Sequence, residues 1–258
     1  MRSASEQPGG AVQRAVAAAL AEATGRETRN NLVLPVTGGP AGNALLTAWT
    51  ALVLLALSVA ELLTLFDVRG LISWHVALGA LLVPPAIMKT ASTGWRMVRY
   101  YLGNTPYRQA GPPPLLLRLL GPLVVVSTLG LLGTGVLLVL LGEQRSHRSL
   151  GTLLGFRVDW VSAHQGFFVV WAAATGLHLL GRIAPALRAT VLTGAAPVVA
   201  GRWTRVLWFV VMVASAAALA VVLVHAEGSW ASFHSFGQDG APFGPFRLSA
   251  LLGSSPRR

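Results

Sequence analysis

Four nitrogen-bearing side chains lie within long apolar stretches of this sequence, and their spacing repeats. His75 and Lys89 are 14 residues apart in one stretch, and His164 and His178 are 14 residues apart in another. Fourteen residues is close to four helical turns, so each pair lies on one face of a helix, about 21 Å apart along its axis. Ionisable side chains inside a membrane are costly and mark candidate functional sites. These nitrogens could ligate a metal ion.

Two opposed nitrogens suit haem b, because its iron takes one axial ligand from each side of the porphyrin. If both stretches run in the same direction, His75 faces His164 at one depth and Lys89 faces His178 at another. We therefore expect one haem between His75 and His164, called the outer histidines below, and a second between Lys89 and His178, called the inner pair. Burial and coordination would both favour the neutral amine of Lys89. Met88 is the alternative ligand, although it points about 100° elsewhere on the helix.

Each candidate also has a simpler explanation. The two outer histidines could be polar residues that bond across helices, and Lys89 could be an interfacial lysine whose ammonium group reaches the membrane surface. Glycines spaced 14 apart could admit a porphyrin edge or could only pack helices; they are Gly121 and Gly135. Arginines beside the two layers could pair with haem propionates or only set orientation; they are Arg69, Arg96, Arg99 and Arg182. Glu61 is either an interfacial carboxylate or a proton-handling group near a quinol site.

The composition indicates an integral membrane protein. Of the 258 residues, 53% are hydrophobic and only 11% are charged, whereas soluble proteins have about 25% charged residues. The net charge of +11 does not indicate nucleic acid binding, because the arginines lie in blocks between apolar runs. The chain has no cysteine, which excludes disulfides, iron–sulfur clusters and thiol catalysis.

Five stretches are long and apolar enough to be membrane-spanning helices. They are 44–66, 71–91, 119–141, 160–181 and 204–225. Thirteen of the 20 lysines and arginines lie on the side that carries the N-terminus. The positive-inside rule then places the N-terminus in the cytoplasm and the C-terminus outside.

The expected architecture is all-α, with a four-helix haem-binding transmembrane bundle and a fifth transmembrane helix. We divide the chain into a partly disordered cytoplasmic extension, the four-helix core, a loop with the fifth helix, and an extracytoplasmic tail. Their bounds are 1–43, 44–184, 185–226 and 227–258. The proline run of the inner loop, 112–114, cannot be helical and is expected to lie along the membrane surface.

Residues 44–184 resemble the di-haem cytochrome b core of respiratory bc complexes and the related b561-like bacterial cytochromes. The segments that carry the resemblance are "STGWRMVRYYLGNTPYRQAGPPPLLLRLLGPLVVVSTLGLLGTGVLL" and "AHQGFFVVWAAATGLHLLGR". The resemblance implies an electron-transfer subunit that works between a quinone or quinol pool and a partner oxidoreductase. It matches His75 and His164 to the outer ligands and His178 to an inner one. The chain departs from the pattern at Lys89, where the family has histidine.

Three functions remain open from the sequence. The first is electron transfer through haem b, with membrane lipid, a separate redox partner and a quinone as the expected partners. The second is a haem-free small transporter whose intramembrane histidines relay protons. The third is a haem-free membrane scaffold. The chain shows no motif for a flavin, a nicotinamide or molybdenum.

Overall fold

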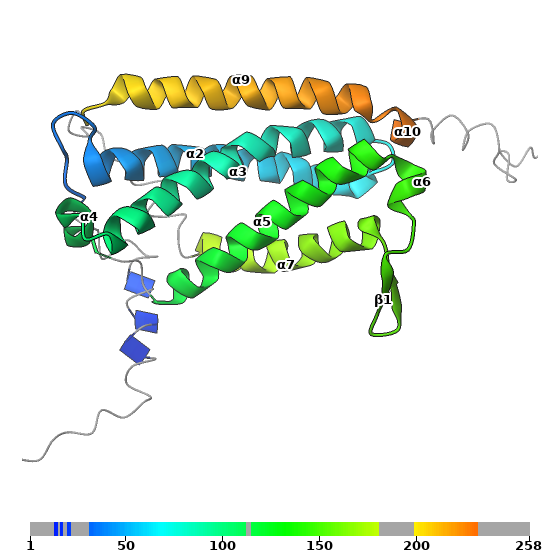
Figure 1. Cartoon of the computed structure of the whole chain (residues 1–258), viewed down its shortest axis with the longest axis horizontal. Coiled ribbons are helices and arrows are strands. Elements are labelled where there is room, and N and C mark those ends of the chain that lie inside the picture. The colour runs from blue at the N-terminus through cyan, green and yellow to red at the C-terminus, as the bar shows by residue number, and fades with distance from the viewer. Residues whose placement is uncertain are drawn as a thin grey trace, which may run out of the picture.

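The computed structural model describes residues 13–14, 16–17, 20–21, 31–111, 115–180 and 199–231. Five long helices dominate the described part and run side by side (Figure 1). They are α2 (Gly39–Thr64), α3 (Ile72–Tyr101), α5 (Leu115–Leu141), α7 (Trp160–Leu180) and α9 (Arg202–Ala226). Shorter elements lie between or after them: η1 (Leu65–Asp67), α4 (Thr105–Gln109), α6 (Glu143–Ser146), β1 (Gly151–Leu153), β2 (Phe156–Val158) and α10 (Gly228–Ala231).

Four of the helices are long and apolar enough to cross a membrane, which confirms the prediction of a mostly helical membrane protein. Their apolar segments are Gly39–Asp67, Ile72–Tyr101, Arg118–Leu141 and Arg202–Ala226. Helix α7 is not among these four, although its 21 residues pack along α5. Two histidines and Gln165 make α7 less apolar than its neighbours.

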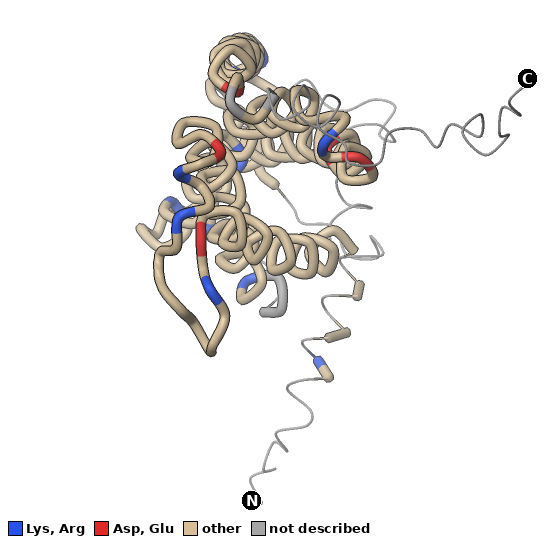
Figure 2. The backbone as a smooth tube through the Cα atoms, turned by 90° about the vertical axis from the view of Figure 1, so that its right-hand side faces the viewer, with Lys and Arg blue, Asp and Glu red and all other residues tan. Residues whose placement is uncertain are grey.

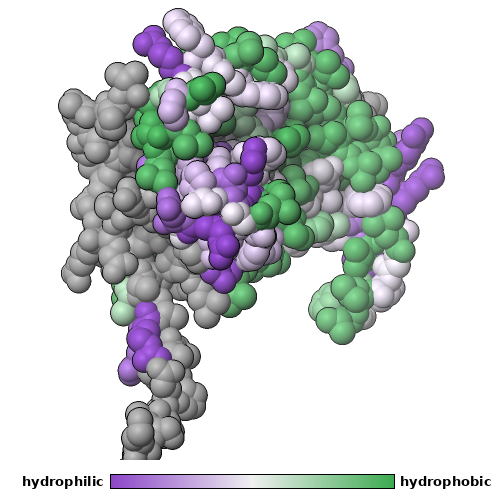
Figure 3. All heavy atoms as spheres, turned by 60° about the vertical axis from the view of Figure 1, so that its left-hand side comes forward, coloured by the Kyte–Doolittle hydropathy of each residue, from purple (hydrophilic) through white to green (hydrophobic). Residues whose placement is uncertain are grey.

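The surface of the long helices also fits contact with lipid. Large apolar side chains are exposed along them, such as Trp203 (72%) and Leu207 (63%) on α9 and Leu140 (63%) on α5. In Figure 3 hydrophilic side chains gather at the end of the bundle nearest the viewer, and hydrophobic ones cover the flank. The hydrocarbon core holds no water to hydrogen-bond with polar side chains, so helices that face lipid expose apolar side chains.

Helix α3 is the centre of the packing. It lies against α2, α9 and α5, and α5 in turn packs against α7. The small core cluster joins three of these helices, through Val76 and Ala80 on α3, Val139 on α5 and Leu223 on α9. Since Val76 follows the first turn of α3 and Val139 precedes the end of α5, the two helices are antiparallel. Helices α3 and α7 therefore run in the same direction.

Two features of the connections differ from the predicted spans. Helix α3 was expected to end near Ala91 but continues to Tyr101. The residues after Ala91 are more polar than the predicted span, yet they remain helical. A two-stranded antiparallel hairpin, β1–β2, joins α6 to α7 and pairs Leu153 with Phe156. This hairpin is the exception to an all-α fold within the described residues. The proline run 112–114 and Arg182 lie outside the described residues.

Candidate haem site

The structure brings the two outer histidines together. His75 lies in the first turn of α3 and His164 in the second turn of α7. Their ring centroids are 6.4 Å apart, and the ring planes are nearly perpendicular at 85°. The two side chains come from separate antiparallel pairs, α2–α3 and α5–α7. The matched depth predicted from the sequence is thus observed.

Each of these rings is held by a threonine on the helix that precedes it in the fold. Thr64 Oγ1, at the end of α2, lies 2.9 Å from Nδ1 of His75. Thr134 Oγ1, on α5, lies 3.0 Å from Nδ1 of His164. Both threonines are buried. Their hydroxyls also donate to backbone carbonyls, Thr64 to Glu61 O (2.6 Å) and Thr134 to Gly130 O (2.7 Å).

These contacts fix which nitrogen each ring offers. A hydroxyl that already donates to a carbonyl accepts from its other neighbour, so Nδ1–H of His164 donates to Thr134. The Nδ1–H of His75 is shared between Thr64 Oγ1 and Glu61 Oε1, each 2.9 Å from Nδ1. The proton then sits on Nδ1, and Nε2 carries the lone pair that can bind a metal. Hydrogen bonding of the second ring nitrogen is the usual way in which proteins orient histidine ligands.

Glu61 adds a charge to the His75 side of the pair. Its Oε1 lies 2.9 Å from Nδ1 of His75, and the side chain is 17% exposed. Its second oxygen, Oε2, is buried and has no hydrogen-bond partner in the described part of the structure. A Cβ atom placed on Gly79, one turn beyond His75, would lie 3.6 Å from Oε1. This is an ordinary van der Waals distance, so α3 passes directly beside the carboxylate at Gly79.

The separation of the ring centroids matches the spacing of two imidazoles that bind one metal from opposite sides. Two metal–imidazole bonds of about 2 Å, together with the distance from each nitrogen to its ring centre, add up to about 6 Å, close to the observed 6.4 Å. Among the described residues, no group of three or more His, Cys, Asp or Glu side chains could hold a metal ion. A haem needs only two protein ligands, because the porphyrin supplies the others. The residues present fit a haem.

Gly135 lies against the ring of His164, whereas the sequence led us to expect a contact with a porphyrin edge. A Cβ atom built there would lie 3.3 Å from Cε1 of His164, so the glycine gives that ring its place against α5. At Gly121 a Cβ atom would meet nothing within 4 Å. Among the described residues, open space therefore surrounds Gly121 near the start of α5. Its contact with a porphyrin stays a prediction.

The inner pair is arranged along the same two helices. Lys89 is half-buried on α3, and the hydroxyl of Ser92 donates to its carbonyl oxygen (3.0 Å). His178 lies in the last turn of α7, and its Nδ1 is buried. Pro84 and Pro85 lie inside α3 between His75 and Lys89. Their missing N–H groups interrupt the helical hydrogen bonding of α3 between His75 and Lys89. The ligand roles of Lys89 and His178 stay predictions.

The predicted arginines have varied surroundings. Arg96 Nη2 donates to Oδ1 of Asn31 (3.0 Å), and the guanidinium of Arg99 lies 4.5 Å above the ring of Trp95. Arg69 is exposed in the short connection between α2 and α3. All three are at the ends of the helices, where either propionate pairing or orientation would place them.

Sequence reasoning missed Thr64 and Thr134 altogether. No common spacing marks them, because Thr64 precedes His75 by 11 residues and Thr134 precedes His164 by 30. A short loop separates Thr64 from His75, and Thr134 stands beside Gly135 in an otherwise apolar run.

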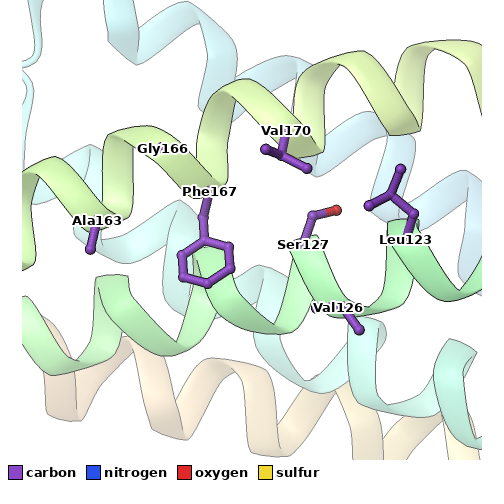
Figure 4. Close-up of a pocket in the computed structure, with 7 residues that line it drawn as sticks. All are labelled: Leu123, Val126, Ser127, Ala163, Gly166, Phe167 and Val170. Carbon is purple, nitrogen blue, oxygen red and sulfur yellow. The ribbon is translucent and has the colours of Figure 1, made fainter. Parts of the chain in front are cut away.

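A shallow groove lies between α5 and α7 (Figure 4). Ala163, one of its lining residues, directly precedes His164 in the chain. The groove has a volume of about 350 Å³. Its lining is almost wholly apolar: Leu123, Val126, Ser127, Ala163, Gly166, Phe167 and Val170. The one hydroxyl in it belongs to Ser127, which donates to Val124 O of its own helix (3.2 Å).

Comparisons with models of known protein families, with curated proteins and with solved structures found no match for this chain. The four apolar helices alone therefore indicate a membrane protein, and the histidine pair is the feature from which a function can be proposed.

Proposed function

We propose that this chain is a membrane b-type cytochrome that transfers electrons across the bilayer through haem b. The observation that carries the proposal is the His75–His164 pair, with ring centroids 6.4 Å apart and both Nδ1 atoms held by buried threonines. A haem bound there would supply a one-electron iron couple. The chain's own residues would orient the two ligands, fix their protonation and exclude water.

A second haem between Lys89 and His178 would extend the path toward the inner end of the bundle. The support is positional, because both residues lie about 21 Å beyond their outer counterparts on parallel helices. Electrons could then pass between two layers, as the resemblance to di-haem cytochromes b implies. The electron-transfer partners proposed are a quinone or quinol pool and a separate oxidoreductase.

In this proposal α7 also spans the membrane, as the fourth helix of the haem-binding core, and α9 is the fifth transmembrane helix. Helix α7 packs along α5 and carries a ligand at each level, and haem would cover the polar rings that reduce its hydropathy. The N-terminus would be cytoplasmic and the C-terminus extracytoplasmic in a bacterial inner membrane, with the basic residues on the cytoplasmic side. The groove between α5 and α7 suits an acyl or isoprenoid chain, since its lining includes no charged side chain.

A haem-free proton relay is the second candidate. The contact of Glu61 with His75, and of His75 with His164, could pass protons between titratable groups. The haem proposal explains one further feature, because both Nδ1 atoms are engaged by threonines and the two Nε2 atoms are left to bind a shared partner.

An absorption spectrum of the purified full-length protein tests the proposal. The dithionite-reduced protein is expected to show the α band of a low-spin b-type cytochrome. Pyridine haemochrome quantitation would then give one or two haems per chain. Protein that folds in the membrane without any bound haem would contradict the proposal and favour the proton relay.

A further inference from the structure

The β1–β2 hairpin extends away from the helical bundle. It leaves the end of the bundle that carries His75 and His164, and both Figure 1 and Figure 2 show it projecting sideways from the helices. The long helices would cross the membrane along their axes. A hairpin that extends sideways from their ends therefore runs along the membrane surface, over the lipid beside α5 and α7.

The two faces of the hairpin differ in polarity. Side chains alternate between the faces of a strand, and directly paired residues share a face. Leu153 pairs with Phe156 on one face, and Thr152 pairs with Arg157 on the other. Leu153 is 65% exposed and Phe156 is 77% exposed. The hairpin is thus an amphipathic ribbon whose apolar face lacks a protein neighbour in the described structure.

The turn at the tip adds a third apolar side chain. Leu154 has a φ of 52° and Gly155 a φ of 83°, the left-handed conformation of both central residues in a tight hairpin turn. Among the described residues, Leu154 is the one non-glycine with a positive φ. Asparagine, aspartate or glycine would relieve the strain there. A leucine that is 90% exposed instead places an apolar group at the farthest point of the ribbon.

Positive charge exceeds negative charge at the base of the hairpin, where three arginines accompany Glu143 and Asp159. Arg145 and Arg148 are exposed just before β1, and Arg157 is anchored by donating from Nη2 to the carbonyl of His147 (2.7 Å). Asp159, the nearest acidic residue after β2, is engaged in capping α7 through Ser162. The base therefore presents guanidinium groups where lipid phosphates lie.

We propose that the β1–β2 hairpin is an interfacial anchor. Its apolar face and the tip at Leu154 enter the boundary between headgroups and acyl chains, and the arginines at its base contact the phosphates of anionic phospholipid. This occupant is favoured because the ribbon runs along the membrane, continues the lipid-facing surface of α5 and α7, and combines apolar with basic residues. The apolar tip is the hydrophobic lobe at the lower right of Figure 3. The inference does not depend on haem binding.

The absence of native cysteine allows a direct test. Leu154→Cys, Phe156→Cys and, as the matched control on the polar face, Thr152→Cys would each be spin-labelled in the full-length protein. The labelled proteins would be placed in nanodiscs that contain anionic phospholipid. Power saturation would compare collisions with oxygen, which concentrates in lipid, and with a nickel chelate, which stays in water.

The expected ratio of oxygen to nickel collisions is severalfold higher at Leu154 and Phe156 than at Thr152. Replacing the anionic lipid with a neutral one should lower the ratio at Leu154, and the double variant Arg145→Gln/Arg148→Gln should remove that dependence. Equal collision with the nickel chelate at all three positions would overturn the anchor. Labels at Leu154 and Phe156 that are shielded from both reagents would also overturn it, because a protein partner would then cover the ribbon.

Discussion

The imidazole rings of His75 and His164 come from two separate helical pairs and meet in an edge arrangement, with centroids 6.4 Å apart and planes at 85°. Each ring is fixed by its own threonine, so neither orientation depends on the other ring. A pair arranged in this way can hold a ligand between two independently supported nitrogens. It also makes the two sides of the site separable by mutation.

His75→Ala and His164→Ala should each abolish the low-spin b-type spectrum that the proposed outer haem would give. Loss of either axial nitrogen leaves the iron with one strong protein ligand, so the spectrum should become high-spin or disappear. His225→Ala is the matched control, because this histidine lies at the end of α9 and its ring bonds to Val221 O of the same helix (2.7 Å). An unchanged spectrum in both outer variants would contradict the assignment.

The inner layer predicts a different outcome. His178→Ala should reduce the haem content by one per chain and leave the outer signal in place, as measured by pyridine haemochrome and the reduced spectrum. Lys89→Ala should have the same effect if its amine is the opposite ligand, whereas Met88→Leu should not. Loss of haem in the Met88 variant alone would assign the thioether instead. A chain that carries a single haem in the wild type would contradict the inner layer.

Much of the fold could be predicted from the sequence, because apolar runs of membrane length dictate helices. Four predicted spans correspond to α2, α3, α5 and α9, and the shared depth of His75 and His164 followed from helix direction alone. The extension of α3 to Tyr101 could not be predicted in the same way. Its last turns are polar, so hydropathy stops at the membrane boundary while the helix continues.

The surroundings of the histidines depend on details that periodicity does not contain. Thr64 meets His75 because the α2–α3 connection fixes the rotation of both helices, and that rotation is set by packing. The β1–β2 hairpin was missed because strands of three residues are too short to show alternation. Leu154 is not a residue type typical of tight turns, so Gly155 was the one local indication of a turn there.

Gly130→Ala should loosen the contact between α5 and α7. A Cβ atom at this position would come 2.3 Å from Cε1 of Phe167, which is too close for any side chain. The ring must shift, and overpacking of this kind typically costs about 1–3 kcal/mol. The measurable result is a lower midpoint of thermal unfolding in detergent.

Two variants make the Gly130 prediction specific. Gly133→Ala lies on the same helix, where a Cβ atom would meet nothing within 4 Å, and it should be neutral or stabilising because alanine favours helix by about 1 kcal/mol. Adding Phe167→Ala to Gly130→Ala should relieve the overlap, so the double variant should cost less than the sum of the single ones. Additive effects would show that the two residues do not meet.

Asp159 should make the start of α7 sensitive to acid. Its carboxylate accepts a hydrogen bond from the backbone N–H of Ser162 (2.8 Å), and the Ser162 hydroxyl accepts one from the Asp159 N–H (2.9 Å). The backbone bond is the main reason that the pKa of Asp159 is held below its usual value of 3.8. Because the folded pKa is lowered, the stabilisation is complete above the unfolded value and is lost as the pH falls through the folded pKa.

The measurement compares thermal unfolding of wild type and variants at neutral pH and in acid below 3.8. Asp159→Ala should lower stability at neutral pH by about 1 kcal/mol, the usual value of a helix cap. Asp159→Asn should keep most of the cap, since asparagine caps nearly as well, but lose the acid dependence at this position. An alanine variant as stable as the wild type at neutral pH would refute the capping role.

Glu61→Gln should raise the midpoint potential of the outer haem. The carboxylate lies 2.9 Å from Nδ1 of His75 and makes that ring a more electron-rich ligand, which favours the oxidised iron. A charge-assisted hydrogen bond exceeds a neutral one by about 1 kcal/mol, which corresponds to roughly 40 mV for one electron.

Redox titration monitored at the α band measures this shift. Glu143→Gln is the control, because it removes the same charge from the short α6 helix, and Glu143 is not among the described partners of His75 or His164. An equal rise in both variants would mean that the overall charge sets the potential, and no rise in Glu61→Gln would mean that Thr64 alone governs the ring.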